Sequence, residues 1–422
     1  MDRRNVLKTL GVVAGTGAVG TTSLLSTAAW AQASQPIKLG FISSLSGPQA
    51  PLGQPMLLGA QIAVDQINKA GGVNGRKLEL VVRDDKAKPA DATVAARELA
   101  GSGVNMLLGV VSSAVALAIS AMLEQEKALL ITCAAHSDKL TKENFVRNYF
   151  RVTDNPYMRE RALAKMAAQR YSGITRWTGI IPDHEYGRTT WGCFEDGLRE
   201  FYPSLAKKQP IITQPVKTQY GAPDYRSAIT AAMATPAEGF MVSVYGGDAV
   251  TLFKQAEAFG FFKKAKLIID SANELLVAKA MKQDLPDMWV GTHWYAGAFE
   301  DVAVSRELQA EAVRRTNDRL TQGWLAEGHA AVMAYAKALQ AAGSTDTQVV
   351  LSALESVTFE TATGPRNFRK EDHQAIKPVV MYRLRGSAKS SDGFEVVDVI
   401  RVPGADVIDP ATPGKALTLR TA

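Results

Sequence analysis

Short apolar runs alternate with stretches of helical periodicity from residue 36 onward. Alternate positions between 37 and 41 are apolar, as in a strand, whereas the apolar residues of 57–70 recur at the spacing of one helical face. A glycine-rich turn at 71–75 ends this helix, and Pro89 suits the first turn of the next one. The same patterns predict further strands at 78–82, 106–111 and 129–132. Strict alternation of strand and helix predicts an α/β fold with parallel sheets covered on both faces.

The rhythm restarts after a break at 150–156. Strands are predicted at 177–181, 240–244 and 267–269, and helices at 188–202, 225–234, 249–259 and about 328–342. The tail contains two apolar runs with no helix between them, at 379–384 and 394–402. No low-complexity linker separates the halves, and 291–297 offers a second crossing between them. We therefore expect two α/β units of similar size that are joined by several chain crossings.

Composition narrows the functional classes. The 422 residues are 46% hydrophobic and 21% charged, which is ordinary for globular proteins and excludes a disordered chain. Two cysteines, Cys133 and Cys193, exclude a disulfide framework and a multi-cysteine zinc module. The net charge of +6 is small for this length, and the lysines and arginines are scattered, so we expect no nucleic-acid partner.

The first 31 residues have the features of an export signal. Arg3-Arg4 precedes a weakly apolar stretch at 10–29, and Ala29-Trp30-Ala31 is a small-x-small cleavage pattern. The paired arginines resemble a twin-arginine signal, so we expect cleavage after Ala31 and a periplasmic protein. A membrane anchor is the alternative, but glycine, serine and threonine make the stretch too weakly apolar. A G-x-G-x-x-G pattern at 15–20 lies inside this segment and is rejected as a dinucleotide site.

Motifs of catalysis are missing from the rest of the chain. The five histidines show neither H-E-x-x-H nor H-x-x-x-H spacing, so the sequence predicts no metal site. Asp84-Asp85 is a tempting carboxylate pair, but its place ahead of Pro89 favours turn and capping chemistry. Cys133 has no neighbour in sequence that would make it a thiolate, which favours a buried free cysteine. We expect neither enzymatic activity nor a cofactor.

Four ordered groups of residues resemble the periplasmic binding proteins of branched-chain amino acid ABC importers, of the leucine/isoleucine/valine-binding type. They are Ile37-Lys-Leu-Gly-Phe-Ile-Ser-Ser-Leu-Ser-Gly-Pro48; Ile67-Asn-Lys-Ala-Gly-Gly-Val-Asn-Gly-Arg-Lys77; Gly109-Val-Val-Ser-Ser113 with Ala134-Ala-His136; and Asp183-His-Glu-Tyr-Gly187 with Gly364-Pro365 and Asp372-His-Gln374. The resemblance covers nearly the whole chain after the signal. It implies a type I fold of two Rossmann-like lobes joined by three hinge crossings. The expected boundaries are 36–152 plus 293–364 for the N-lobe, and 153–292 plus 365–410 for the C-lobe.

The resemblance also implies a function and partners. Such receptors close around a small ligand and deliver it to the permease subunits of an ABC importer, and we expect a monomer. Ser112 and Ser113 end a strand and begin a helix, where backbone N–H groups and the helix dipole favour a ligand carboxylate. Helix capping alone is the alternative role for these serines. Ala135 and His136 end the next strand, and His136 departs from the small hydroxyl residue of similar receptors.

The remaining predicted ligand contacts come from the other parts of the motifs. Leu52 is expected to form an apolar wall, and Tyr186 and Tyr245 to close over the ligand from the C-lobe, with Gly246 allowing close backbone approach. Asp270 is the candidate partner for a ligand ammonium, with Ser271 as the alternative occupant of that position. An amino acid of the branched-chain type is the leading ligand. An aromatic acid, an amide or urea, and a ligand-sensing regulator, remain alternatives.

Overall fold

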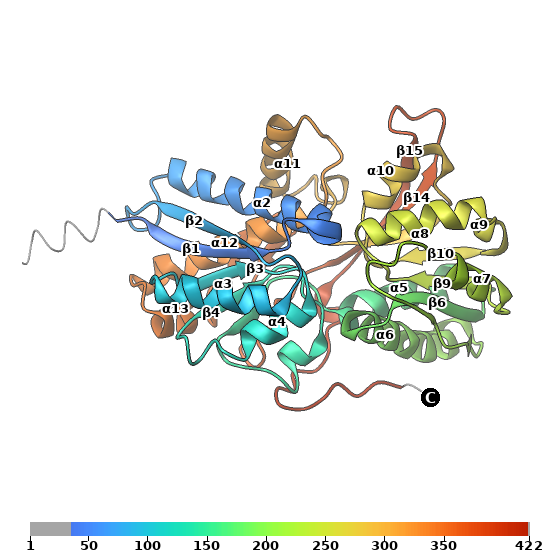
Figure 1. Cartoon of the computed structure of the whole chain (residues 1–422), viewed down its shortest axis with the longest axis horizontal. Coiled ribbons are helices and arrows are strands. Elements are labelled where there is room, and N and C mark those ends of the chain that lie inside the picture. The colour runs from blue at the N-terminus through green and yellow to red at the C-terminus, as the bar shows by residue number, and fades with distance from the viewer. Residues whose placement is uncertain (1–34, 421–422) are drawn as a thin grey trace, which may run out of the picture.

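The computed structural model describes residues 35–420, which form two lobes lying side by side (Figure 1). The predicted signal segment 1–31 lies outside the described residues. Each lobe is a twisted sheet with helices against its faces, which confirms the α/β fold expected from the alternating pattern. Among residues 35–420, no helix is both long and apolar enough to cross a membrane.

The first lobe contains a five-stranded sheet in the order β2-β1-β3-β4-β5, and every pairing in it is parallel. The strands are β1 (Ile37–Ser43), β2 (Leu78–Asp84), β3 (Met106–Gly109), β4 (Leu129–Thr132) and β5 (Tyr149–Arg151). The helices are α2 (Ala50–Lys69), α3 (Pro89–Gly101), α4 (Ser113–Ser120), α11 (Ala303–Thr316), α12 (Trp324–Ala342) and α13 (Thr347–Leu354). The predicted first-lobe strands are confirmed, and β5 is a further strand that overlaps the start of the expected break.

Helices α2 and α12 pack closely in this lobe because each has a glycine at the contact. A Cβ atom on Gly59 would lie 1.8 Å from the carbonyl oxygen of Leu325, and one on Gly328 would lie 1.9 Å from that of Met56. No larger residue fits at either position without moving the helices apart. This contact joins the C-terminal part of the chain to the first lobe.

The second lobe contains an eight-stranded sheet in the order β15-β14-β11-β10-β9-β6-β7, with β8 also paired to β6. The parallel strands are β6 (Arg176–Pro182), β7 (Ile211–Ile212), β8 (Val216–Thr218), β9 (Gly239–Val242), β10 (Leu267–Asp270) and β11 (Met288–Thr292). The tail adds two antiparallel strands, β14 (Val379–Gly386) and β15 (Phe394–Val402), as its pattern predicts. The helices are α5 (Pro156–Arg170), α6 (Glu185–Phe201), α7 (Arg226–Ala234), α8 (Gly247–Ala258), α9 (Phe261–Lys264) and α10 (Leu276–Met281).

The chain passes between the lobes at three places. The first crossing follows β5 and the second follows β11, close to the expected positions. The third lies later than residue 365, because Phe368 and Ala375 pack in the hydrophobic core of the first lobe. The hairpin of β12 (Phe359–Thr361) and β13 (Gly364–Arg366) also belongs to that lobe, since Phe359 shares the same core. The sequence-based boundary therefore assigned about ten residues to the wrong lobe.

Candidate functional site

A cavity of about 230 Å³ lies between the two lobes. This volume suits a small ligand, since drug-sized ligands occupy pockets of about 300–1,000 Å³. Six of the nine ligand contacts predicted from sequence line it, whereas Ala135, Gly246 and Asp270 do not. The lining residues are Gln49, Leu52, Ala87, Val111, Ser112, Ser113, Ala114, Ala134, His136, His184, Glu185, Tyr186, Tyr220, Tyr245, Ala272 and Trp324.

The first lobe contributes the end of β3 and the beginning of α4 to the wall. Ser112 is the N-cap of α4, and its Oγ accepts a hydrogen bond from the Val115 N–H at 3.5 Å. Ser113 lines the cavity, and its Oγ accepts from the His136 N–H at 3.2 Å, which joins the ends of β3 and β4. The first N–H groups of a helix have no partner within the helix, so this end can bind an anion.

Val110, just before these serines, is held in a strained conformation. Its φ of +61° is rare for a β-branched residue, and its N–H donates to the carbonyl oxygen of Ile42 at 2.7 Å. Strain of this kind persists only where the surroundings enforce it, and it is concentrated at functional sites. Here it redirects the chain from β3 into the turn that begins α4.

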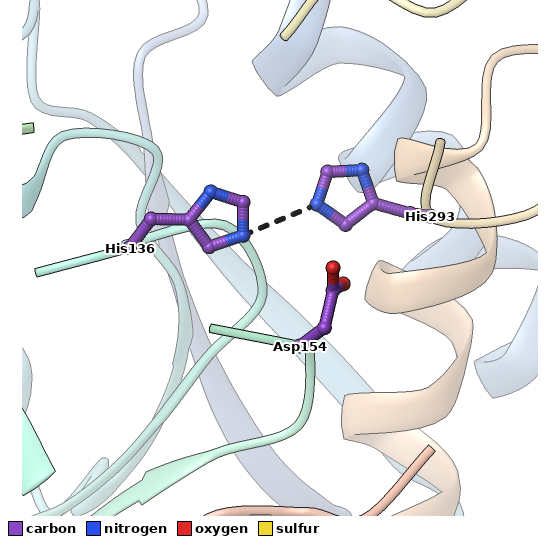
Figure 2. Close-up of side chains that lie close together, drawn as sticks. All are labelled: His136, Asp154 and His293. Carbon is purple, nitrogen blue, oxygen red and sulfur yellow. Dashed lines mark hydrogen bonds between the residues drawn. The ribbon is translucent and has the colours of Figure 1, made fainter. Parts of the chain in front are cut away.

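His136 lies on the cavity wall and is one end of a buried chain of polar groups. Its Nε2 lies 3.4 Å from Nε2 of His293, and the His293 Nδ1 lies 2.7 Å from Oε1 of Glu274 (Figure 2 shows the two histidines). The backbone N–H groups of His293 and Gly323 also donate to the Glu274 carboxylate. Burial, and next the charge of Arg159, hold the pKa values of both histidines well below the usual range, so both rings are neutral.

The second lobe contributes mainly aromatic rings. Tyr186 stands in the first turn of α6 and Tyr245 follows β9, and their ring centroids are 5.2 Å apart at an interplanar angle of 85°. The Gln49 side-chain amide of the first lobe donates to the Tyr245 hydroxyl at 3.1 Å, which closes that edge of the cavity. Tyr245 also lies 3.4 Å from Nε2 of His184, another lining residue. Burial raises the pKa of Tyr245, so its hydroxyl is neutral.

Gly246 lies beside the cavity, where the two lobes meet. It has a φ of +67°, and a Cβ atom there would lie 2.5 Å from the carbonyl oxygen of Pro48 in the first lobe. Its N–H donates to Oδ1 of Asn273 at 3.0 Å. Glycine is therefore required both by backbone conformation and by the close approach of the lobes. Contact between Gly246 and a ligand stays a prediction.

Asp270 is fully buried at the end of β10, and its side chain stabilises the turn that follows this strand. Its Oδ1 accepts from the backbone N–H groups of Ala272 and Asn273 at 2.9 and 3.2 Å, and from the Asn273 side-chain amide at 2.9 Å. Burial raises the pKa of Asp270 to about 7. Ala272 lines the cavity in this region and Asp270 does not. The carboxylate that was expected in the wall is therefore replaced by a methyl group.

Glu185 is the one carboxylate among the lining residues, and it is already paired. Lys139 lies 3.3 Å from its Oε2, and the Ser137 hydroxyl donates to its Oε1 at 3.3 Å. Both partners belong to the first lobe, so these contacts close the other side of the cavity. Ala135 is buried in the core behind the wall, between its lining neighbours Ala134 and His136.

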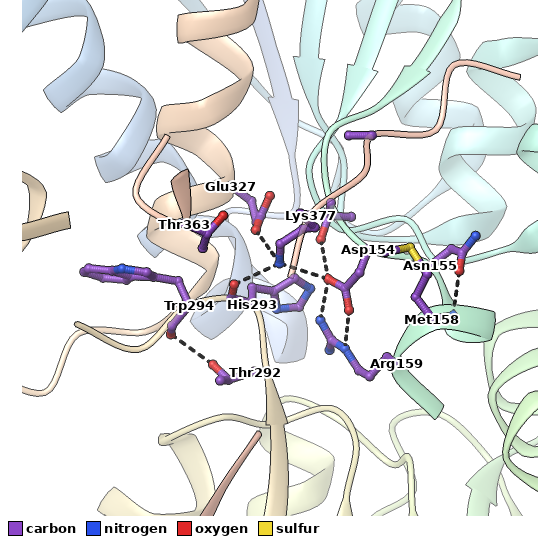
Figure 3. Close-up of polar contacts among 12 residues, drawn as sticks. Asp154, Asn155, Met158, Arg159, Thr292, His293, Trp294, Glu327, Thr363 and Lys377 are labelled. Carbon is purple, nitrogen blue, oxygen red and sulfur yellow. Dashed lines mark hydrogen bonds and ion pairs between the residues drawn. The ribbon is translucent and has the colours of Figure 1, made fainter. Parts of the chain in front are cut away.

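A buried ionic cluster, which the sequence analysis missed, joins the three crossings next to this site (Figure 3). The Lys377 ammonium on the third crossing lies 3.2 Å from Asp154 Oδ1 on the first, and it donates to the carbonyl oxygen of His293 on the second at 2.9 Å. It also lies 3.1 Å from Glu327 of α12, and Arg159 binds the Asp154 carboxylate at 2.7 and 3.0 Å. Because all of these residues are buried, the charges can be accommodated only in pairs.

His136, Asp154 and His293 bring potential metal-ligand atoms within 4.8 Å of one another (Figure 2). The Asp154 oxygens, however, are bound by two cations, Arg159 and Lys377. A divalent cation would have to compete with both and would be repelled by them. The donor set therefore fits a hydrogen-bonded ionic cluster better than a metal site.

Other sequence-based interpretations of single residues are also resolved by the structure. Asp85 Oδ1 accepts from the Ser44 hydroxyl at 2.6 Å and from the Ala87 N–H at 2.8 Å, and Asp84 Oδ1 accepts from the Lys86 N–H at 2.9 Å. Both residues of the Asp84-Asp85 pair therefore stabilise the turn, as predicted. Cys133 is a buried free cysteine, as expected, and burial raises the pKa of its thiol.

The chain is similar to known solute-binding proteins over most of its length. Residues 36–391 match the family model described as periplasmic binding protein. The chain is 26% identical over 342 residues to the leucine-, isoleucine-, valine-, threonine-, and alanine-binding protein of Pseudomonas aeruginosa, with 81% of this chain and 88% of that protein covered.

Solved structures share the fold. The branched-chain amino acid transporter substrate binding protein of Streptococcus pneumoniae, in complex with isoleucine, has a TM-score of 0.73 at 22% identity, covering 87% of this chain and 99% of that one. A solute binding protein of an ABC transporter from Rhodopseudomonas palustris, in complex with 3,4-dihydroxy benzoic acid, has a TM-score of 0.73 at 18% identity, covering 87% and 98%. The chain thus belongs to the periplasmic binding protein family and has the two-lobed type I fold that its motifs predict.

Proposed function

We propose that the protein is the solute receptor of an ABC importer, which captures a small carboxylate-bearing ligand between its lobes and delivers it to the membrane permease. The observation that carries the proposal is the interlobe cavity with the beginning of α4 in its wall. Ser113 and Ala114 would hold the ligand carboxylate there, because unpaired N–H groups and the helix dipole favour a negative charge. The role is capture and release, with no covalent change in the ligand.

Two ligand classes follow from different observations. The name of a relative from Pseudomonas aeruginosa gives leucine, isoleucine and valine among its ligands. An amino acid of the branched-chain type is therefore the first class to test. The rings of His136, Tyr186, Tyr245 and Trp324 in the wall favour an aromatic acid as the second class, because flat rings pack well against one another. The export signal expected from sequence and the membership of a periplasmic family support a periplasmic location and an importer permease as partner.

A thermal-shift screen of the purified protein tests the proposal. The probes are leucine and benzoate, each paired with the derivative in which a neutral amide group replaces the carboxylate. Leucinamide is used at a pH at which its amine is protonated, as the amine of leucine is. A ligand that binds only the native state stabilises it by about 2.7 kcal/mol at a hundredfold excess over its dissociation constant. We expect a carboxylate to raise the melting temperature and its amide to do so much less. Equal shifts for acid and amide, or no shift with any carboxylate, would contradict the proposal.

A further inference from the structure

The hydrogen-bond partners of His293 determine which of its ring nitrogens carries the proton. Its Nδ1 faces Oε1 of Glu274 at 2.7 Å, and that same oxygen accepts from the backbone N–H of His293 at 3.0 Å. The other carboxylate oxygen accepts from the Gly323 N–H. Glu274 is thus surrounded by donors, so Nδ1 of the neutral His293 is protonated and its Nε2 carries a lone pair.

This lone pair in turn determines the protonation of His136. The two Nε2 atoms are 3.4 Å apart, and one of them must donate, so the proton lies on Nε2 of His136. The Nδ1 of the neutral His136 ring is then an acceptor. Figure 2 shows Nδ1 on the edge of the ring that faces away from Asp154 and His293. Within residues 35–420 it has no hydrogen-bond partner, and the ring lines the cavity, so a bound ligand that displaces water from this nitrogen has to supply a donor in its place.

The charges around His136 decide what kind of donor this is. Burial lowers the pKa of His136, and so do Arg159, Arg151 and Lys377, while Asp154 acts in the opposite direction. A field that opposes a proton on the imidazole also opposes a ligand ammonium placed against it. The lining carboxylate Glu185 is paired with Lys139, and Asp270 lies outside the wall. A buried ammonium would therefore remain uncompensated, which is expensive.

We propose that the Glu274–His293–His136 chain selects an uncharged hydrogen-bond donor on the ligand, so that the ligand is a carboxylate bearing a hydroxyl group in place of an ammonium group. The inference rests on the proposed receptor function and names its ligand class. His136 is the specificity-determining residue, and His293 and Glu274 are positioning residues that set its tautomer.

Isothermal titration with two matched series tests the proposal. The aromatic series is para-hydroxybenzoate, para-fluorobenzoate and para-aminomethylbenzoate; the aliphatic series is the hydroxy-acid analogue of leucine, isocaproate and leucine. The titrations are done at about pH 8, because burial raises the pKa of Glu274 to about 7 and the carboxylate is ionised above it. We expect the hydroxyl member of the better-binding series to bind at least about tenfold more tightly than its two partners.

Variants show whether a loss of binding comes from lost recognition of the hydroxyl or from damage to the fold. Damage to the fold weakens all members of a series alike, whereas a change of tautomer changes the ratio of their dissociation constants. His136→Phe removes the acceptor and should reduce the hydroxyl preference to less than about threefold. Phenylalanine can also narrow the cavity, so Glu274→Leu provides a second test. It removes the acceptor oxygen that faces Nδ1 of His293, leaves the lining residues unchanged and should cause the same loss of preference. The control is His329→Phe, another buried histidine, which contacts Gln66 and lies outside the cavity wall, and it should keep the wild-type ratio.

Three outcomes would overturn the proposal. If leucine or para-aminomethylbenzoate binds most tightly, the inference fails while the receptor function stands. If the hydroxyl preference survives in both His136→Phe and Glu274→Leu, another group recognises the hydroxyl. If no member of either series binds, the inference and the proposed function both fail.

Discussion

The two walls of the cavity differ in chemistry. The first-lobe wall is built from strand ends and the beginning of a helix, and it presents Ser112, Ser113 and the His136 ring. The second-lobe wall presents mainly tyrosine rings and the methyl group of Ala272. One wall is suited to hold a negative charge and the other to cover the body of the ligand. A ligand that bridges them would hold the lobes together, and four predictions test how each wall and the crossings between them contribute.

The largest effect is expected where the walls are joined. Lys377→Met removes the cation that links the three crossings and leaves Asp154 and Glu327 with fewer partners. Breaking a buried charge pair costs about 3–5 kcal/mol, so the free energy of unfolding in urea should fall by that amount. Lys337→Met, on the exposed face of α12, is the control and should change it by less than about 0.5 kcal/mol. If Lys377→Met lowers the free energy of unfolding by less than about 0.5 kcal/mol, as the control does, the cluster does not hold the crossings together.

The first-lobe wall is tested by Ser113→Leu. The larger apolar side chain covers the beginning of α4 and fills part of the cavity, so ligand affinity should fall at least a hundredfold, or about 3 kcal/mol. Titration calorimetry with the best ligand of the screen measures the loss, and Ser352→Leu on the surface of α13 is the control. Unchanged affinity in Ser113→Leu, with a folded protein, would place the carboxylate elsewhere.

Asp270 tests the absence of an unpaired carboxylate from the second-lobe wall. Its pKa is 3.8 in the unfolded chain and about 7 in the native one, so the native state holds the extra proton between these values. Stability contributed by this group therefore falls as the pH rises through that window. Between pH 5 and pH 7, the free energy of unfolding of wild type should fall by about 2 kcal/mol more than that of Asp270→Asn, which lacks the titrating group.

The same Asp270→Asn variant has a ligand-binding outcome. Because Ala272 and not Asp270 lines the cavity, ligand affinity should change less than about twofold. Parallel pH profiles of the two proteins would contradict the burial of a protonated carboxyl. A large loss of affinity would restore Asp270 as the partner of a ligand ammonium.

Tyr245→Phe, which removes only a hydroxyl from the second-lobe wall, should lower ligand affinity much less than Ser113→Leu does. The hydrogen bond from Gln49 across the cavity edge is lost, so affinity should fall by about threefold to tenfold. Tyr382→Phe, on β14 of the same lobe but outside the wall, is the control. A loss of affinity equal to that of Ser113→Leu would show that the second-lobe wall also binds the ligand carboxylate.

Local patterns were sufficient to predict most of the fold and the first-lobe wall. Most strands of the two sheets follow from apolar spacing, although β5, β7, β8 and β11 were not predicted as strands. Ser112, Ser113 and His136 follow from their places at strand ends. These features depend on residues that are neighbours in sequence. The third crossing was misplaced because the short hairpin at 359–366 has no periodicity of its own and belongs to the first lobe only through its packing.

Long-range partners could not be predicted in this way. His136 and His293 are 157 positions apart, and Lys377 meets Asp154 across 223 positions. Their juxtaposition follows from where the crossings bring the chain together. The sequence offered Asp270 or Ser271 for one position in the wall, but Ala272 lines the cavity there. A shift of one or two positions past the end of β10 changes which side chain enters the cavity, and local patterns do not determine that shift.

A crystal structure of the protein with the tightest-binding carboxylate of the screen tests the central claim most directly. We expect the ligand carboxylate within about 2.7–3.2 Å of the Ser113 and Ala114 N–H groups, and the body of the ligand against Tyr186 and Tyr245. A carboxylate directed toward the second-lobe wall, or a ligand bound outside the interlobe cavity, would contradict it.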